Sequence, residues 1–388
     1  CVKVKKIAVC ICAAAAVISA SSVRVYALSE EDISAKAAVV YQPDTGEVLF
    51  GKNMNERLPM ASTTKIMTTL LLIENGSLDE EFTVDSEAIK TEGSSMGLRE
   101  GDIVTGRDIC AGMLLPSGND AANASAVYVA GSIERFGELM NLRAGLIGMR
   151  NTHFVTPSGL HDDEHYSTAY DMALLASEAL ENDVFAEICA SPTIKTHFGN
   201  PPYDRYLKNT NKLLNMYGGC IGVKTGFTDE AGRCLVSACE RNGVRLVCVT
   251  LNDRNDWNDH MNMYDDAYSR ICPVSVDMGE VRADVVGGYA DSVRLIQSEE
   301  VIYPSADGYN PEITCRVIVP NFVYAPVEEG QVCGKMEFSA DGRVFAECTL
   351  EAAESTEYYS APTETEEKSF FEKLIDKIKD FFETVNSM

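Results

Sequence analysis

The chain has 388 residues and a formal net charge of −26, because 59 aspartates and glutamates outnumber 33 lysines and arginines. A chain this acidic is not expected to bind nucleic acid, since proteins bind phosphates through Lys and Arg. Its 45% hydrophobic and 24% charged residues are ordinary for a soluble globular protein and argue against disorder or a polytopic membrane protein. The length allows two or three domains.

Residues 1–27 have the layout of a secretory signal peptide. Three lysines among the first six residues precede an apolar run at 7–18, and Val25-Tyr26-Ala27 matches a small-residue cleavage site. The apolar run is shorter than the ~20 residues that a membrane-spanning helix needs. We therefore expect export and removal of 1–27.

The predicted elements of 28–273 begin with a β-hairpin, in which strands at 37–41 and 47–50 flank the turn Pro43-Asp44-Thr45-Gly46. Apolar periodicity then predicts helices, which lie at 62–74, 107–115, 121–131 and 167–182. Strands follow at 221–225, 234–240 and 244–251, and a helix at about 257–271 closes this region. This order predicts an α+β fold with an antiparallel sheet flanked by helices.

The pattern changes at 274–350, where short β-rich runs alternate with Gly, Pro and Asp. We predict a small all-β domain there, followed by an acidic linker at 351–368. The last segment, 369–388, has the spacing of an amphipathic helix, with an apolar face of Phe370, Phe371, Leu374, Ile375, Ile378, Phe381, Phe382 and Val385.

The amphipathic segment favours membrane association by a helix that lies in the interface. Packing against the β domain and self-association are the alternatives. Four acids balance four lysines in this region, so attraction to anionic lipid would be weak and apolar burial would contribute most.

The cysteines do not indicate a particular site. Ten of the thirteen remain after 1–27 is removed, and no C-x-x-C occurs, so zinc ribbons and thioredoxin-like sites are not indicated. Their scatter fits a disulfide framework no better than buried small hydrophobes. The only cluster of His and acids, 161–165, fits a polar loop better than a metal site, so we expect no metal and no other cofactor.

The first candidate catalytic motif is Ser62-Thr63-Thr64-Lys65, an S-x-x-K at the start of a predicted helix. A spacing of three places Ser62 and Lys65 on one helical face. A serine becomes a good nucleophile when a neighbouring base takes its proton, and Lys65 can do so only if burial or another cation lowers its pKa. Alone, the motif also fits a capping serine followed by a surface lysine.

Two further motifs follow: Ser117-Gly118-Asn119, an S-x-N in a loop between helices, and Lys224-Thr225-Gly226, a K-T-G on a predicted strand. A lysine beside a threonine hydroxyl suits a carboxylate, and a glycine lets a substrate backbone lie close to the strand. Each motif alone also fits a turn or a strand end. A helix start, an interhelical loop and a strand together predict one catalytic cleft.

In this combination the motifs resemble those of the serine penicillin-recognising enzymes. The resemblance is closest to the low-molecular-mass D-alanyl-D-alanine carboxypeptidases and covers about residues 30–273. The segments that resemble this family are 61–68, 93–96, 115–122, 151–160, 165–169, 209–211 and 222–228. The resemblance implies a transpeptidase-like domain at 28–273, with a helical subdomain beside its sheet.

The resemblance also implies a mechanism. Ser62 would attack the carbonyl of the penultimate D-alanine of a peptidoglycan stem peptide and form an acyl-enzyme, with Lys65 as its general base. Ser117, supported by Lys224, would relay a proton to the departing D-alanine. β-Lactams would acylate the same serine and leave slowly.

The implied substrate-binding residues lie in the second and third motifs. Asn119 would hold the substrate's peptide group, and Thr225 would bind its terminal carboxylate beside Gly226. The backbone N–H groups of Ser62 and Phe227 would form the oxyanion hole. Some family members have His where this chain has Phe227, a difference that a backbone donor tolerates.

Four other functions share part of this sequence pattern. A class A β-lactamase needs a glutamate for deacylation, and no E-x-x-L-N segment lies between Asn119 and Lys224. The G-x-S-x-G match at 93–97 lacks the apolar strand that precedes a nucleophile elbow. A D,D-endopeptidase acting on peptidoglycan crosslinks and a non-catalytic binder of wall peptides remain alternatives. In each case the protein would act outside the cytoplasmic membrane.

Overall fold

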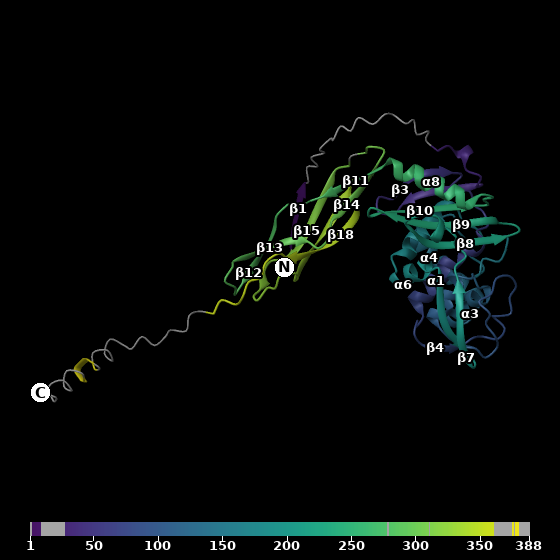
Figure 1. The fold of residues 1–388 in the computed structure, drawn as a ribbon, viewed down its shortest axis with the longest axis horizontal. Coiled ribbons are helices and arrows are strands. Elements are labelled where there is room, and N and C mark those ends of the chain that lie inside the picture. Colours follow the sequence, from purple (N-terminus) through teal and green to yellow (C-terminus); the bar gives the residue numbers. More distant parts are fainter. Residues whose placement is uncertain are drawn as a thin grey trace. The chain divides into compact units, whose positions relative to one another are not determined.

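The computed structural model describes residues 2–8, 28–277, 279–309, 311–360, 375 and 377–379. The chain divides into two compact units (Figure 1). The larger unit comprises 12–276 and 302–311, and the smaller one comprises 1–11, 277–301 and 312–388. Each unit is described by itself.

The larger unit contains a five-stranded antiparallel sheet in the order β3-β2-β10-β9-β8. Its strands are β2 (Ala37–Gln42), β3 (Glu47–Lys52), β8 (Cys220–Thr228), β9 (Gly232–Arg241) and β10 (Val244–Leu251). The predicted antiparallel sheet is thus confirmed. β8 is an edge strand, so the backbone groups on its outer side have no strand partner in this sheet.

Helices cover both faces of this sheet (Figure 1). Alternate residues of a strand point to opposite faces. Val39 accordingly lies in one core together with residues of α1 (Lys65–Asn75) and α5 (Ala169–Leu180). Its neighbour Val40 lies in a second core with residues of α8 (Asp256–Arg270). The sheet is therefore buried on both sides.

The remaining helices complete the helical part of the larger unit. They are η1 (Glu30–Asp32), η2 (Ala61–Thr64), α2 (Gly106–Leu114), α3 (Asn119–Ala130), α4 (Ile133–Ile147), α6 (Asp183–Ala190) and α7 (Leu213–Met216). The sequence did not predict α4 or α6. The predicted helix at 62–74 is a 3-10 turn, η2, that leads into α1.

Helix α1 is central to this unit, because every residue from Lys65 to Leu72 is buried. It packs against α2, α3, α5 and α6 as well as β8. A helix that is buried all round has no solvated face on which to place a charged residue. The lysine at its first position is consequently enclosed by protein.

Two short hairpins lie beside the helices: β4 (Glu81–Thr83) with β5 (Ile103–Thr105), and β6 (Thr193–Gly199) with β7 (Pro202–Lys208). Arg205 ties them together, since its guanidinium forms a buried ion pair with Asp102 and donates to the Gly97 carbonyl at 2.7 Å. The same guanidinium stacks on the rings of Phe198 and Tyr203. Neither β6 nor β7 was predicted.

The smaller unit is all-β, as predicted. Its seven-stranded sheet has the order β1-β15-β17-β18-β13-β12-β16. These strands are β1 (Val2–Ala8), β12 (Val281–Val286), β13 (Ser292–Gln297), β15 (Ile313–Pro320), β16 (Val323–Tyr324), β17 (Val332–Ala340) and β18 (Arg343–Ala352). β1 is an edge strand and falls within the predicted signal peptide.

Two strands near the predicted domain boundary pair in the larger unit: β11 (Ile271–Val276) and β14 (Val301–Ala306). Part of the predicted acidic linker is also paired, because the bridges Val327↔Thr356 and Gly288↔Tyr358 hold it to the smaller unit's sheet. Most of the predicted amphipathic helix at 369–388 lies outside the described residues; 375 and 377–379 are helical.

Among the described helices, none is both long and apolar enough to cross a membrane. The ten cysteines in the described ranges are all free.

Candidate active site

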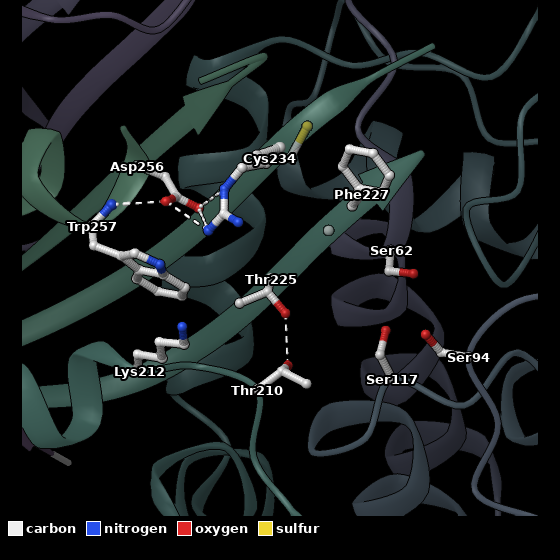
Figure 2. Close-up of a pocket in the computed structure, with 12 residues that line it drawn as sticks. Ser62, Ser94, Ser117, Thr210, Lys212, Thr225, Phe227, Cys234, Asp256 and Trp257 are labelled. Carbon is white, nitrogen blue, oxygen red and sulfur yellow. Dashed lines mark hydrogen bonds and ion pairs between the residues drawn. The ribbon is translucent and has the colours of Figure 1, made fainter. Parts of the chain in front are cut away.

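A cleft of about 320 Å³ opens along β8 in the larger unit (Figure 2). Its lining residues are Ser62, Ser94, Ser117, Thr210, Lys212, Thr225, Gly226, Phe227, Arg233, Cys234, Asp256 and Trp257. In Figure 2 the hydroxyls of Ser62 and Ser117 lie at one end of the cleft, and Asp256 and Trp257 lie at the other. The three sequence motifs therefore meet in one place, as the sequence predicted.

Ser62 and Lys65 form the first contact of the site, with Lys65 Nζ 2.8 Å from Ser62 Oγ. The same amine lies 2.7 Å from Asn119 Oδ1 and 2.6 Å from the Ser158 carbonyl oxygen. Ser62 is partly exposed to the cleft, whereas Lys65 has no exposed surface. The serine is accessible to a substrate, and the amine beside it is shielded from water.

The environment of Lys65 lowers its pKa well below the usual value of 10.5, mainly through burial and then through the charge of Lys224. Asp120 opposes this effect only in part. A neutral amine has two hydrogens and one lone pair, and the two carbonyl oxygens of Asn119 and Ser158 can only accept hydrogen bonds. A neutral amine that donates its two hydrogens to these oxygens can turn its lone pair toward Ser62 Oγ.

Two glycines allow the backbone around Ser62 to pack this closely. Gly159 has a positive φ of 82°, and a Cβ there would lie 1.9 Å from the Ala61 carbonyl oxygen. Gly226 of the K-T-G motif lies against the same turn, and a Cβ there would lie 3.0 Å from the Ser62 nitrogen. Ala61 itself has a positive φ of 48°, an uncommon conformation for a residue with a side chain. The packing thus holds the serine in a constrained turn.

Ser117 and Lys224 form the second contact, with Lys224 Nζ 3.0 Å from Ser117 Oγ. Lys224 Nζ also donates to the Thr225 carbonyl at 2.7 Å. Burial lowers the pKa of Lys224 to about 7. Ser117 has a positive φ of 67°, so its hydroxyl is also presented from a strained position. Near neutral pH this lysine can hold or give up a proton.

Asn119 and Asp120, at the start of α3, connect the site to the loop at 93–98. Asn119 Nδ2 donates to the Glu92 carbonyl at 2.7 Å. The Asp120 carboxylate accepts from the backbone N–H groups of Met96, Gly97 and Leu98 and from Ser95 Oγ, at 2.6–3.0 Å. Asp120 therefore fixes the loop that carries Ser94 into the cleft.

His165 supports the turn that carries Ser62, which we call the nucleophile turn. Its Nδ1 accepts from the backbone N–H groups of Val155 and Thr156, so its Nε2 carries the hydrogen and donates to Thr64 Oγ1 at 2.8 Å. Thr64 in turn donates to the Ala61 carbonyl. Burial lowers the pKa of His165 to about 4, so the ring stays neutral and acts as a structural support.

The far end of the cleft is polar and cationic. Thr225 Oγ1 lies 2.7 Å from Thr210 Oγ1, a contact that Figure 2 marks with a dashed line. Arg233 makes a forked pair with Asp256, through Nε at 3.0 Å and Nη2 at 2.7 Å, and lies near the ring of Trp257. Its Nη1 makes no described hydrogen bond. Lys212 lines the same end. This end suits a carboxylate.

All eight residues predicted from the motifs lie in or directly beneath the cleft. Phe227 is at its rim, with 62% of its surface exposed. The sequence did not assign roles to Ser94, Asp120, Ser158, His165, Thr210, Lys212, Arg233, Asp256 and Trp257. Most of these lie in segments that resemble the family, but only the fold shows what each one contacts. In the described part of the chain, no group of His, Cys, Asp or Glu is arranged to hold a metal.

Two family models match this chain. The family model described as D-alanyl-D-alanine carboxypeptidase matches residues 24–255. The model described as penicillin-binding protein 5, C-terminal domain, matches residues 276–358.

Similar proteins include DacF, a D-alanyl-D-alanine carboxypeptidase of Bacillus subtilis, 34% identical over 84% of this chain and 87% of the relative. A D-alanyl-D-alanine endopeptidase of Pseudomonas aeruginosa is 32% identical over 57% of this chain and 72% of the relative. Among solved structures, penicillin binding protein 5 from Haemophilus influenzae matches with a TM-score of 0.61 and 25% identity, over 85% of this chain and 99% of that one.

The role of Asp120 can be tested with Asp120→Asn. The amide keeps one acceptor oxygen where the carboxylate has two, so we expect amide hydrogen exchange at Met96, Gly97 and Leu98 to accelerate about tenfold or more. Asp85→Asn is a matched control, because the Asp85 carboxylate accepts from the backbone N–H groups of Glu87 and Ala88, which lie outside the loop at 96–98. Unchanged exchange at 96–98 in Asp120→Asn would show that another contact holds the loop.

Proposed function

Since this chain belongs to the D-alanyl-D-alanine carboxypeptidase family of serine peptidases, we propose that it removes the terminal D-alanine of peptidoglycan stem peptides through an acyl-enzyme on Ser62. The observation that carries this proposal is the 2.8 Å contact between Ser62 Oγ and the fully buried amine of Lys65. A buried amine with a lowered pKa can take the proton of the serine as it attacks.

In the acylation step, the lone pair of Lys65 accepts the Ser62 hydroxyl proton while Ser62 Oγ bonds to the carbonyl carbon of the penultimate D-alanine. The negative charge that develops on the carbonyl oxygen is stabilised by the backbone N–H groups of Ser62 and Phe227. The glycine at 226 supports this arrangement, because it lets β8 approach the nucleophile turn within van der Waals contact.

The departing D-alanine nitrogen needs a proton before the peptide bond breaks. We assign its delivery to Ser117, which gives up its hydroxyl proton and regains one from Lys224 at 3.0 Å. A pKa of about 7 suits this exchange, since Lys224 is partly protonated near neutral pH. Water then attacks the acyl-enzyme and releases the shortened peptide.

The substrate backbone is proposed to bind along β8. As the edge strand of its sheet, β8 has outward-facing N–H and C=O groups that an extended peptide can pair with. Asn119 assists with one amide hydrogen, because its Oδ1 is used by Lys65 and only one hydrogen is needed for the Glu92 carbonyl.

The terminal carboxylate of the substrate is proposed to bind at the cationic end of the cleft. Thr225 and Thr210 supply adjacent hydroxyls, and Arg233 and Lys212 supply positive charge. Arg233 is oriented by its forked pair with Asp256, which leaves Nη1 available for the substrate.

Carboxypeptidase activity is favoured over endopeptidase activity by how the relatives match. The relatives that align over both domains, at 84% or more of this chain, are named carboxypeptidases, DacF among them. The endopeptidase of P. aeruginosa aligns over 57% of the chain, as do some carboxypeptidases, so the support comes from the relatives that share both domains. A non-catalytic wall-peptide binder would not need a neutral amine held beside an accessible serine hydroxyl.

The setting of this activity is also proposed. Residues 1–27 would direct export, so that the enzyme acts outside the cytoplasmic membrane on peptidoglycan, with β-lactams as covalent inhibitors. The segment 369–388 would hold it at the membrane surface. The support is the sequence pattern of these two segments.

The activity can be measured with a synthetic pentapeptide ending in D-Ala-D-Ala and with a crosslinked peptide dimer. We expect loss of one alanine from the pentapeptide and a kcat/KM that falls on both sides of an optimum. Activity falls at low pH as Lys65 gains a proton, and it falls above about pH 7 as Lys224 loses one. A rate that rises steadily to pH 10 would contradict these assignments, and faster cleavage of the dimer would favour the endopeptidase.

Carboxylate binding can be tested at Arg233. Removing Arg233 alone would leave the buried Asp256 carboxylate without its ion-pair partner, so the informative variant is Arg233→Leu with Asp256→Asn. We expect kcat/KM for the free pentapeptide to fall about tenfold, as for loss of a charged hydrogen bond, with little change for the same peptide carrying a C-terminal amide. An equal fall for both peptides would show that Arg233 has no role in carboxylate recognition.

A further inference from the structure

Exposed aromatic rings gather at one edge of the smaller unit's sheet. We call this group the aromatic edge; its members are Tyr289, Phe322, Tyr324, Tyr358 and Tyr359, with exposed fractions of 63%, 42%, 69%, 63% and 57%. Exposed aromatic residues are ordinary one at a time, but a group of five marks a surface with a binding role.

The backbone brings these rings together from three separate segments. β16 pairs in parallel with the end of β12, so Tyr324 lies beside Val286, which is itself 45% exposed. The segment 354–360 pairs with the turn after β12, through the Gly288↔Tyr358 bridge and the Tyr359 N–H donating to the Gly287 carbonyl. The group is therefore fixed by hydrogen-bonded backbone and is not a chance cluster of loops.

The rings also contact each other in pairs. Tyr289 and Tyr359 meet edge to face with centroids 5.4 Å apart, and Phe322 and Tyr324 do so at 5.2 Å. Such pairs hold the rings in place without burying their outer faces. Rings fixed in this way lose little side-chain entropy when they bind to a surface.

The charge around the aromatic edge limits its partner. The segments 284–291, 320–327 and 354–360 contain Asp284, Asp291, Glu354 and Glu357 but no Lys or Arg, and of these acids Glu354 pairs with Arg282 of β12 at 3.8 Å. Anionic ligands are therefore repelled. The favoured partner is a neutral surface with an apolar interior and with hydrogen-bond acceptors at its boundary. The interface of a zwitterionic bilayer has both features.

The position of the aromatic edge in the chain points to the same partner. Tyr358 and Tyr359 come just before Ser360, and in Figure 1 the chain leaves the smaller unit beside β12. Only residues 361–368 separate this point from the amphipathic segment at 369–388. Fully extended, such a linker spans at most ~30 Å, so a membrane-bound segment would hold the aromatic edge close to the bilayer.

We propose that the aromatic edge is a second membrane-contact site, which inserts its tyrosine and phenylalanine rings into the zwitterionic headgroup region. The inference rests on the proposed membrane association of 369–388 and adds a second point of contact. A single weak anchor binds reversibly, whereas two contacts on one chain strengthen each other. Two contacts would also restrict how the smaller unit is oriented on the membrane.

The test uses the chain from residue 28 onward and phosphatidylcholine vesicles, with binding measured by co-sedimentation. The variant Tyr324→Ser with Tyr359→Ser should weaken vesicle binding about fivefold to tenfold, the loss expected for two interfacial rings. The matched control is Tyr206→Ser with Tyr309→Ser, which removes two exposed tyrosines from the larger unit and should leave binding unchanged. Acylation by penicillin should be the same in all three proteins, which separates this test from that of the catalytic proposal.

A third variant, Leu374→Ser with Ile378→Ser, isolates the terminal segment. Both the aromatic-edge variant and this one should weaken binding, and their combination should weaken it further. Full binding by the aromatic-edge variant would overturn the proposal. If vesicle affinity is unchanged but sedimentation with purified peptidoglycan is reduced, the proposal is overturned and the aromatic edge binds glycan. If vesicle affinity is unchanged but a dimer is lost, the proposal is also overturned and the aromatic edge binds a second copy of the chain.

Discussion

The complete burial of two lysine side chains, Lys65 and Lys224, is the constraint on which the site depends. Burying an ammonium group costs several kcal/mol unless it is paired or loses its proton. The described hydrogen bonds of both amines go to carbonyl and hydroxyl oxygens, which hold a neutral amine as well as a charged one. Burial thus lowers the pKa of both lysines, which lets a lysine act as a base.

The surrounding fold keeps this arrangement in place. Helix α1 is enclosed by other helices and by β8, so its first residue cannot reach solvent. Gly159 and Gly226 allow backbone to pack directly against the nucleophile turn, and neutral His165 supports that turn through Thr64. The same enclosure leaves Ser62 open on the cleft side only, so attack and proton transfer occur in one restricted direction.

The sequence predicted which residues carry out the chemistry better than it predicted which residues hold them in position. Three short motifs sufficed for Ser62, Lys65 and Lys224, because those contacts are carried by the motifs themselves. Asp120 and Arg233 could not be assigned, since their roles depend on a loop 22–25 residues away and on a helix start 23 residues away. The hairpin β6–β7 was missed although Gly199-Asn200-Pro201 is a turn sequence, because its two strands are largely polar and exposed and show little apolar pattern. The aromatic edge joins three segments that only the sheet brings together.

The central claim, that Ser62 is a nucleophile activated by a buried neutral lysine, is tested most directly by intact mass after incubation with penicillin. The wild-type chain should gain the mass of one penicillin, and Ser62→Ala should gain none. Lys65→Met, which keeps the buried volume but removes the base, should acylate at least about a hundredfold more slowly. An adduct of equal mass on Ser62→Ala, or wild-type rates in Lys65→Met, would contradict the account.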